Sequence, residues 1–188
     1  MNHQVETGYH EASHVVFEAG ILGREVLRIS IAPGTNASGA RRLGHVESRG
    51  EIKQLPDFST CTWQPRTRAQ VLALANAASE VAGEVGSAIT RGEWLICAEN
   101  TCRLEIVRAR EIVAKAFPHY HVDFVLQDVA NWTRRFLAAP LPWAAVEAVA
   151  NALLEHRTLD GRAALAIAHR AAAQRAHELR QSQNKAAA

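Results

Sequence analysis

The chain has 188 residues, of which 48% are hydrophobic and 21% are charged, so it is long enough for one globular domain with its own core and too short for two full ones. The net charge of +2 is small and the arginines are spread along the chain, which argues against nucleic-acid binding. No apolar run is long enough to cross a membrane, and the first twenty residues lack a signal peptide's hydrophobic stretch. Three cysteines without a CxxC pair favour reduced thiols. These features predict a cytoplasmic protein that binds neither nucleic acid nor membranes.

Hydrophobic periodicity predicts the elements of the N-terminal third. Residues 7–22 alternate polar and apolar at helical spacing and end in glycines, which predicts a helix. Residues 26–32, with the sequence VLRISIA, have the two-residue period of a half-buried strand. Residues 34–60 are rich in Gly, Ser, Arg and Asn, and they predict a loop or a loose hairpin with one short strand at 44–48.

The rest of the chain is predicted to be helical. Apolar positions recur at helical spacing over residues 66–89, 99–117, 122–137 and 143–155. A turn is expected at Thr158–Gly161, followed by an Ala-rich helix and a frayed polar tail, residues 181–188. Because no linker or repeat separates these parts, residues 1–180 are expected to form a single domain. The predicted fold class is mainly α, in the broad α+β sense, with a small β-sheet or hairpin.

The motif with the most chemical content is HEASH, in which His10 and His14 flank Glu11. Residues four apart on a helix lie on the same face, so both imidazoles can bind one zinc ion. A zinc ion held by two histidines and a third protein ligand keeps one position for water and lowers its pKa, and Glu11 can take the proton of that water as it attacks a peptide carbonyl. The alternative is an amphipathic helix whose histidines face solvent or are hydrogen-bonded in the core.

Three segments extend this interpretation: YHEASHVVFEAGILGREVLRISIAPG, ALANAASEVAGEVGSAI and WAAVEAVANALLEHRTLDGRAALAI. In this order they resemble the HEAGH segment with its following strand, the helix with the AAE-type segment, and the C-terminal pattern of the proteolytic domain of the FtsH family of ATP-dependent zinc proteases and its stand-alone relatives. The resemblance implies a helical metallopeptidase domain in which His10 and His14 bind zinc and Glu11 is the general base. Ser13 stands where the family usually has glycine, which is a small-for-small change.

The third zinc ligand departs from the family pattern. In the family an Asp at the start of the next helix completes the site, whereas the corresponding stretch here, residues 97–102 (CAENTC), contains no Asp. Alignment of the flanking residues places Asn100 or Thr101 at that position. Glu99 is adjacent and offers the carboxylate that zinc prefers. Glu99 is therefore predicted to join the two histidines as the third ligand.

Other candidate groups have structural interpretations beside the functional ones. Thiolates of Cys97 and Cys102 would bind zinc, although buried, inert cysteines are favoured. The His119–His121 pair can share a metal if its backbone is extended, although surface residues at a helix start are favoured. Glu80 and Glu84 lie on one helical face, where either could orient a ligating imidazole, and a solvated acidic face is equally plausible.

Together these features predict a zinc-dependent endopeptidase that hydrolyses flexible or unfolded polypeptides. No GxxxxGK[ST] sequence occurs, so the chain lacks that ATP-hydrolysing machinery, and folded substrates would require a separate ATPase partner. The resembled proteases work as rings, which leaves a homo-oligomer open. The alternative function, motivated by the missing Asp, is a catalytically weak or inactive peptidase fold that acts as a zinc-containing binding or regulatory protein.

Overall fold

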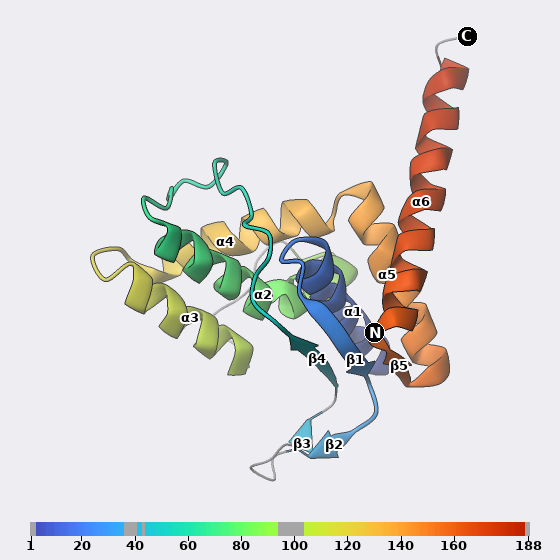
Figure 1. Ribbon diagram of the computed structural model, residues 1–188, viewed down its shortest axis with the longest axis horizontal. Helices are drawn as coiled ribbons and strands as arrows, with labels where there is room; N and C mark the ends of the chain where they lie inside the picture. The colour runs from blue at the N-terminus through green and yellow to red at the C-terminus, as the bar shows by residue number, and fades with distance from the viewer. Residues whose placement is uncertain (1–2, 36–40, 43, 94–103, 187–188) are drawn as a thin grey trace.

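A computed structural model describes residues 3–35, 41–42, 44–93 and 104–186 of the chain (Figure 1). That part is mainly helical with a small sheet, which confirms the predicted fold class. Its elements are, in chain order, α1 (His3–Gly20), β1 (Glu25–Ser30), β2 (Gly34–Thr35), β3 (Arg41–Arg42), β4 (His45–Arg49), α2 (Arg68–Arg91), α3 (Leu104–Ala116), α4 (Val122–Leu137), α5 (Pro140–His156), β5 (Thr158–Asp160) and α6 (Gly161–Ala186).

Most of the helices and strands lie where hydrophobic periodicity predicts them. α2 begins at an N-cap, Thr67, whose side chain accepts a hydrogen bond from the backbone N–H of Gln70, and it ends at Gly92 in the left-handed conformation. α5 begins three residues before the predicted start because prolines in its first turn remove no helical hydrogen bond. α6 continues to Ala186, so it includes residues 181–186 of the expected tail.

The segment predicted as a turn, Thr158–Gly161, differs from the prediction because its first three residues form strand β5. The three-stranded sheet has the order β4-β1-β5, and both pairs are antiparallel. Ile29 in the central strand pairs with Val46 on one side and Leu159 on the other. A Cβ at Gly161 would collide with the backbone carbonyl of Val26, so only glycine lets α6 begin this close to β1. β5 thereby ties the C-terminal helices to the N-terminal hairpin.

The predicted motif helix, α1, lies at the centre of the molecule, with α2 on one side and α5 on the other (Figure 1). Its buried face includes Phe17, which is fully buried and meets the rings of Trp132 and Phe136 edge-to-face at centroid distances of 6.2 and 5.9 Å. Burial of this face fixes the rotation of α1 about its axis. The directions in which the motif side chains of α1 point are therefore fixed as well.

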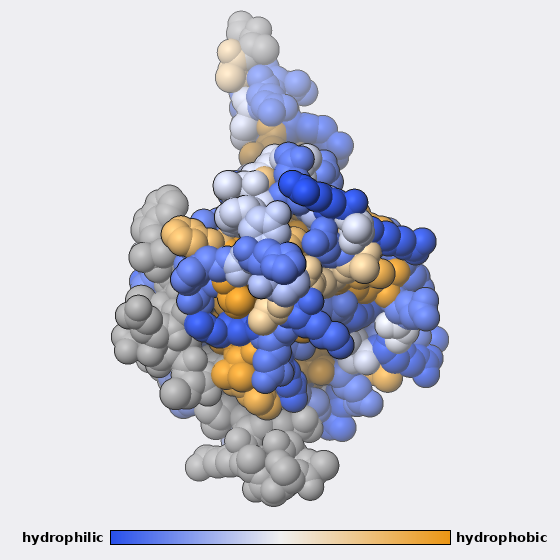
Figure 2. Space-filling model, turned by 90° about the vertical axis from the view of Figure 1, so that its left-hand side faces the viewer, coloured by the Kyte–Doolittle hydropathy of each residue, from blue (hydrophilic) through white to orange (hydrophobic). Residues whose placement is uncertain are grey.

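The end of α6 rises away from the body of the molecule (Figure 1) and is mostly hydrophilic (Figure 2). The buried residues of α6 are confined to its first eight positions: Gly161, Ala164 and Ala168. Among the residues that the structure describes, no single helix is long and apolar enough to cross a membrane. α4 and α5 meet that test by length and composition only when they are joined across an 83° bend.

Candidate metal centre

The centre is built where α1 and α2 run antiparallel to each other. Their side chains pair in opposite order along the two helices, since Glu6 contacts Arg91 and Glu18 contacts Ser79. The helices come close together at Ser13, whose hydroxyl donates to the Tyr9 carbonyl (2.8 Å). A Cβ at Gly86 of α2 would overlap the Ser13 side chain. The glycine that allows close packing is thus on α2, and Ser13 is accommodated on α1.

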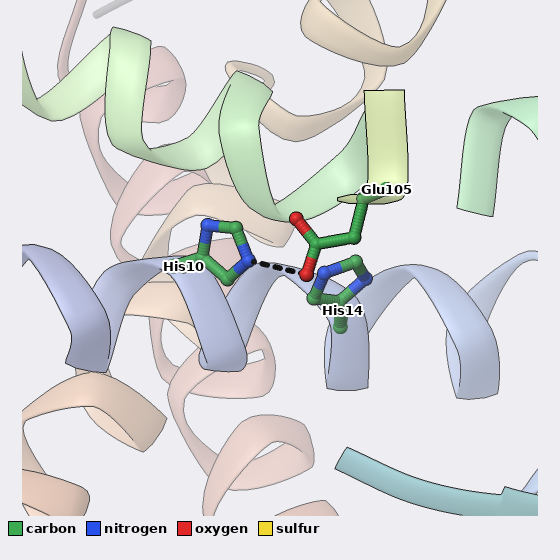
Figure 3. A group of neighbouring side chains, drawn as sticks. All are labelled: His10, His14 and Glu105. Carbon is green, nitrogen blue, oxygen red and sulfur yellow. Dashed lines mark hydrogen bonds and ion pairs between the residues drawn. The ribbon is translucent and has the colours of Figure 1, made fainter. Parts of the chain in front are cut away.

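His10 and His14 of α1 point toward Glu105 in the first turn of α3 (Figure 3). One ligand atom from each of these residues lies within 4.8 Å of those of the other two. His10 Nε2 and Glu105 Oε1 are 3.4 Å apart, and the two residues are 95 positions apart in the sequence. His10 is 7% exposed, and the other two side chains are half-buried. The three groups therefore form a convergent, partly enclosed cluster at the junction of α1, α2 and α3.

Gly83 of α2 provides the space for the imidazoles. A Cβ built at this position would collide with His10 Nε2 and would lie 2.5 Å from His14 Nε2. Both Nε2 atoms therefore face the same point on α2. A larger side chain at position 83 would occupy the volume in which the two imidazoles converge.

Both imidazoles also contact serines of α2. His10 Nδ1 lies 3.4 Å from the Ser87 hydroxyl, and the His14 ring hydrogen-bonds to the backbone of Ser79. Burial, together with the proximity of His10, lowers the pKa of His14 to about 4. His14 is therefore neutral at neutral pH, and a neutral imidazole is the form that binds a metal ion.

Glu11 is buried, at 6% exposed, on the same helix and next to His10. Its carboxylate packs against Gly44, directly before β4, where a Cβ would lie 2.5 Å from Oε1. The side chain of Glu11 is therefore enclosed between its own helix, α1, and the start of the edge strand β4. It contributes no ligand atom to the His10–His14–Glu105 cluster.

The other candidates from the sequence differ in their outcomes. The predicted ligand Glu99 lies outside the described residues, as do Asn100, Thr101, Cys97 and Cys102. His119 is exposed, and His121 is the exposed residue before α4, so in the part of the chain that the structure describes neither joins the metal cluster.

The acidic pair on α2 does not form a solvated face. Glu84 is only 2% exposed and accepts a hydrogen bond from Arg91 (3.1 Å). Glu80 is half-buried, and burial raises its pKa, with Glu105 and Glu18 adding to the effect and Arg108 opposing it.

Glu105 is the site residue that the sequence alignment missed. The resemblance predicts a ligand at residues 99–101, and Glu105 stands four residues after Thr101. Residues four apart share a face of a helix, so an acidic residue one turn past the aligned position was the available signal. The predicted helix 99–117 already contained it.

Two imidazoles and one carboxylate are the ligand set of many catalytic zinc sites, which leave one position for water. Ligands bound at about 2.1 Å in tetrahedral geometry are about 3.4 Å from one another. The separation of His10 Nε2 from Glu105 Oε1 equals this value. The remaining separations are all within 4.8 Å, and side-chain rotation would bring the three ligand atoms to bonding distance of one ion. By donor chemistry and by spacing, the residues present fit a metal ion, and zinc is among the ions they could hold.

No family model matches the chain, and no curated protein matches it. The function is therefore argued from the geometry of the site.

Proposed function

We propose that the protein is a zinc-dependent metallopeptidase that hydrolyses peptide bonds of flexible or unfolded polypeptides. The observation that supports this most strongly is the convergence of Glu105 on the two histidines of the HExxH motif. The motif alone supplies two ligands, and the Glu105 carboxylate from α3 supplies the third protein ligand that a catalytic zinc site needs. The general base expected from the motif, Glu11, adjoins the first ligand in the chain.

In this proposal His10, His14 and Glu105 would hold a zinc ion, which would supply Lewis-acid polarisation of the substrate carbonyl and activation of a water molecule near neutral pH. Glu11 accepts the proton of the attacking water and passes it to the departing amine. The burial of Glu11 against Gly44 limits the hydration of its carboxylate. The low pKa of His14 keeps this ligand available at neutral pH.

Zinc is favoured over harder cations by the two nitrogen donors, since magnesium and calcium prefer oxygen ligands alone. We further propose a cytoplasmic protein whose partner is the polypeptide substrate, with a separate ATPase partner delivering any folded substrate and with self-association left to experiment.

The test is cleavage of a fluorescently labelled unfolded protein by the purified chain, with and without a chelator. We expect activity that the chelator abolishes and added zinc restores. Glu11→Gln removes the base and leaves the three ligands, so it should retain zinc and lose cleavage. A matched control is Glu155→Gln, at an exposed position near the end of α5, which should retain both.

Wild-type protein that holds zinc without cleaving any unfolded substrate would contradict the peptidase. In that case the alternative of a zinc-containing binding or regulatory protein would take its place. Wild-type protein that binds no zinc would contradict both.

A further inference from the structure

Ser79 and Ser87 of α2 contact the metal-binding histidines although neither is a ligand. They lie eight residues apart with Gly83 midway between them, so all three share the face of α2 turned toward α1. Ser87 is completely buried and Ser79 is 7% exposed. A buried hydroxyl requires a hydrogen-bonding partner, and the partners of these two serines connect them to the histidines of the metal centre.

The hydroxyl of Ser87 contacts His10 Nδ1 at 3.4 Å. A metal-bound histidine usually donates its second ring N–H to a fixed acceptor, which selects the tautomer and the ring orientation. With its proton on Nδ1 and directed at Ser87, His10 keeps the lone pair of Nε2. That nitrogen is the one that faces Glu105.

The hydroxyl of Ser79 donates to the carboxylate of Glu18, one turn beyond His14 on α1. Glu18 is 6% exposed and also accepts from Arg24 Nη1 at 3.1 and 3.2 Å. The other amino group of Arg24 donates to Asn76 of α2 (2.8 Å). These partly buried, charge-assisted bonds fix α1 against α2 at the turn where the His14 ring meets the backbone of Ser79.

We propose that Ser87 and Ser79 are positioning residues of the metal centre. Ser87 orients His10 directly through Nδ1. Ser79 acts indirectly: its bond to Glu18 fixes the position of the Ser79 backbone, which the His14 ring contacts. The inference rests on the proposed metal centre, but it does not depend on peptidase activity.

The test compares Ser87→Ala and Ser79→Ala with wild type in the full chain. Zinc dissociation constants are measured by competition with a chromophoric chelator, and the visible spectrum of the cobalt(II) form reports ligand geometry. Loss of a direct partner of a metal-bound histidine weakens metal binding by about 10- to 100-fold, and we expect Ser87→Ala to fall in this range. For Ser79→Ala we expect zinc binding to weaken by about tenfold, the low end of this range, because its hydroxyl acts indirectly.

Thr133→Val is the matched control. It removes one fully buried hydroxyl, bonded to the Val129 carbonyl in α4, and touches no part of the metal centre. It should leave zinc affinity and the cobalt spectrum unchanged even if it lowers stability. Ser87→Thr keeps a hydroxyl and should recover most of the affinity.

The outcomes separate this inference from the proposed function. Wild-type zinc affinity and cobalt spectrum in both alanine variants overturn the positioning roles while the metal centre stands. A loss in Ser87→Ala alone overturns the role of Ser79. A loss in Thr133→Val equal to that in the alanine variants overturns the inference, because general destabilisation would then explain it. Absence of zinc from the wild type overturns the metal centre itself.

Discussion

Replacement of Gly83 with alanine should abolish metal binding without unfolding the protein. The added Cβ would lie 2.5 Å from His14 Nε2 and closer still to His10 Nε2. Since such atoms are in contact at about 3.5 Å, the imidazoles would have to move by about 1 Å. Metal–ligand distances vary by only about 0.2 Å, so the two imidazoles could not both clear the added Cβ and close on one ion. The imidazoles are the ends of rotatable side chains, so they can yield while the helices stay in place.

The fold should not suffer from this substitution, because alanine in a helix interior is favoured over glycine by about 1 kcal/mol. Zinc content and chelator competition measure the first effect, and thermal unfolding followed by circular dichroism measures the second. Gly86→Ala is the comparison, since its Cβ meets the Ser13 hydroxyl, lies 2.7 Å from Ser13 Cβ and lies 3.2 Å from the Tyr9 carbonyl, next to the backbone of α1. It should separate the helices and lower stability. Wild-type zinc affinity in Gly83→Ala would refute the convergence of the two imidazoles on α2.

Three further predictions concern the surroundings of the site. Arg91→Ala should lower the free energy of unfolding by about 3 kcal/mol in urea titrations, because it leaves the buried Glu84 carboxylate without this cation; a loss below 1 kcal/mol would contradict the pairing. Phe17→Ala should cost about 3 to 5 kcal/mol in the same assay, and a cost near zero would show that α1 is not packed as described. Burial raises the pKa of Cys61 to about 11. In a variant whose other two cysteines are replaced by serine, alkylation of the native protein should therefore be slow at pH 8 and accelerate toward pH 11. Rapid alkylation at pH 8 would contradict the burial of Cys61.

Much of the fold is predictable because its helices bury one face each. The apolar repeat over residues 122–137 gives the limits of α4 without error, since Pro118 and Pro140 confine it. β5 is missed because three residues carry no periodicity, and its pairing joins Ser30 to Thr158 across 128 positions. A local pattern cannot encode such a contact.

In the site, as in the fold, local patterns are predictable from the sequence and long-range contacts are not. His10 and His14 share a helix, so their spacing alone predicts that they face one point. The approach of Glu105 depends on how α3 packs on α2, which local periodicity does not determine. The contacts of Ser79 and Ser87 depend on the axial register of α1 against α2, which is fixed by the close approach of Ser13 and Gly86. Because this register depends on tertiary packing, the roles of Ser79 and Ser87 are not predictable from the sequence.

The decisive measurement for the His10–His14–Glu105 ligand set is zinc content, by elemental analysis of purified wild type, Glu105→Ala and Glu99→Ala. We expect about one zinc per chain in wild type and in Glu99→Ala, and a large loss in Glu105→Ala, because the Glu105 carboxylate meets the histidines. Full zinc content in Glu105→Ala, with loss in Glu99→Ala, would contradict the ligand set described here and restore the one predicted from the sequence.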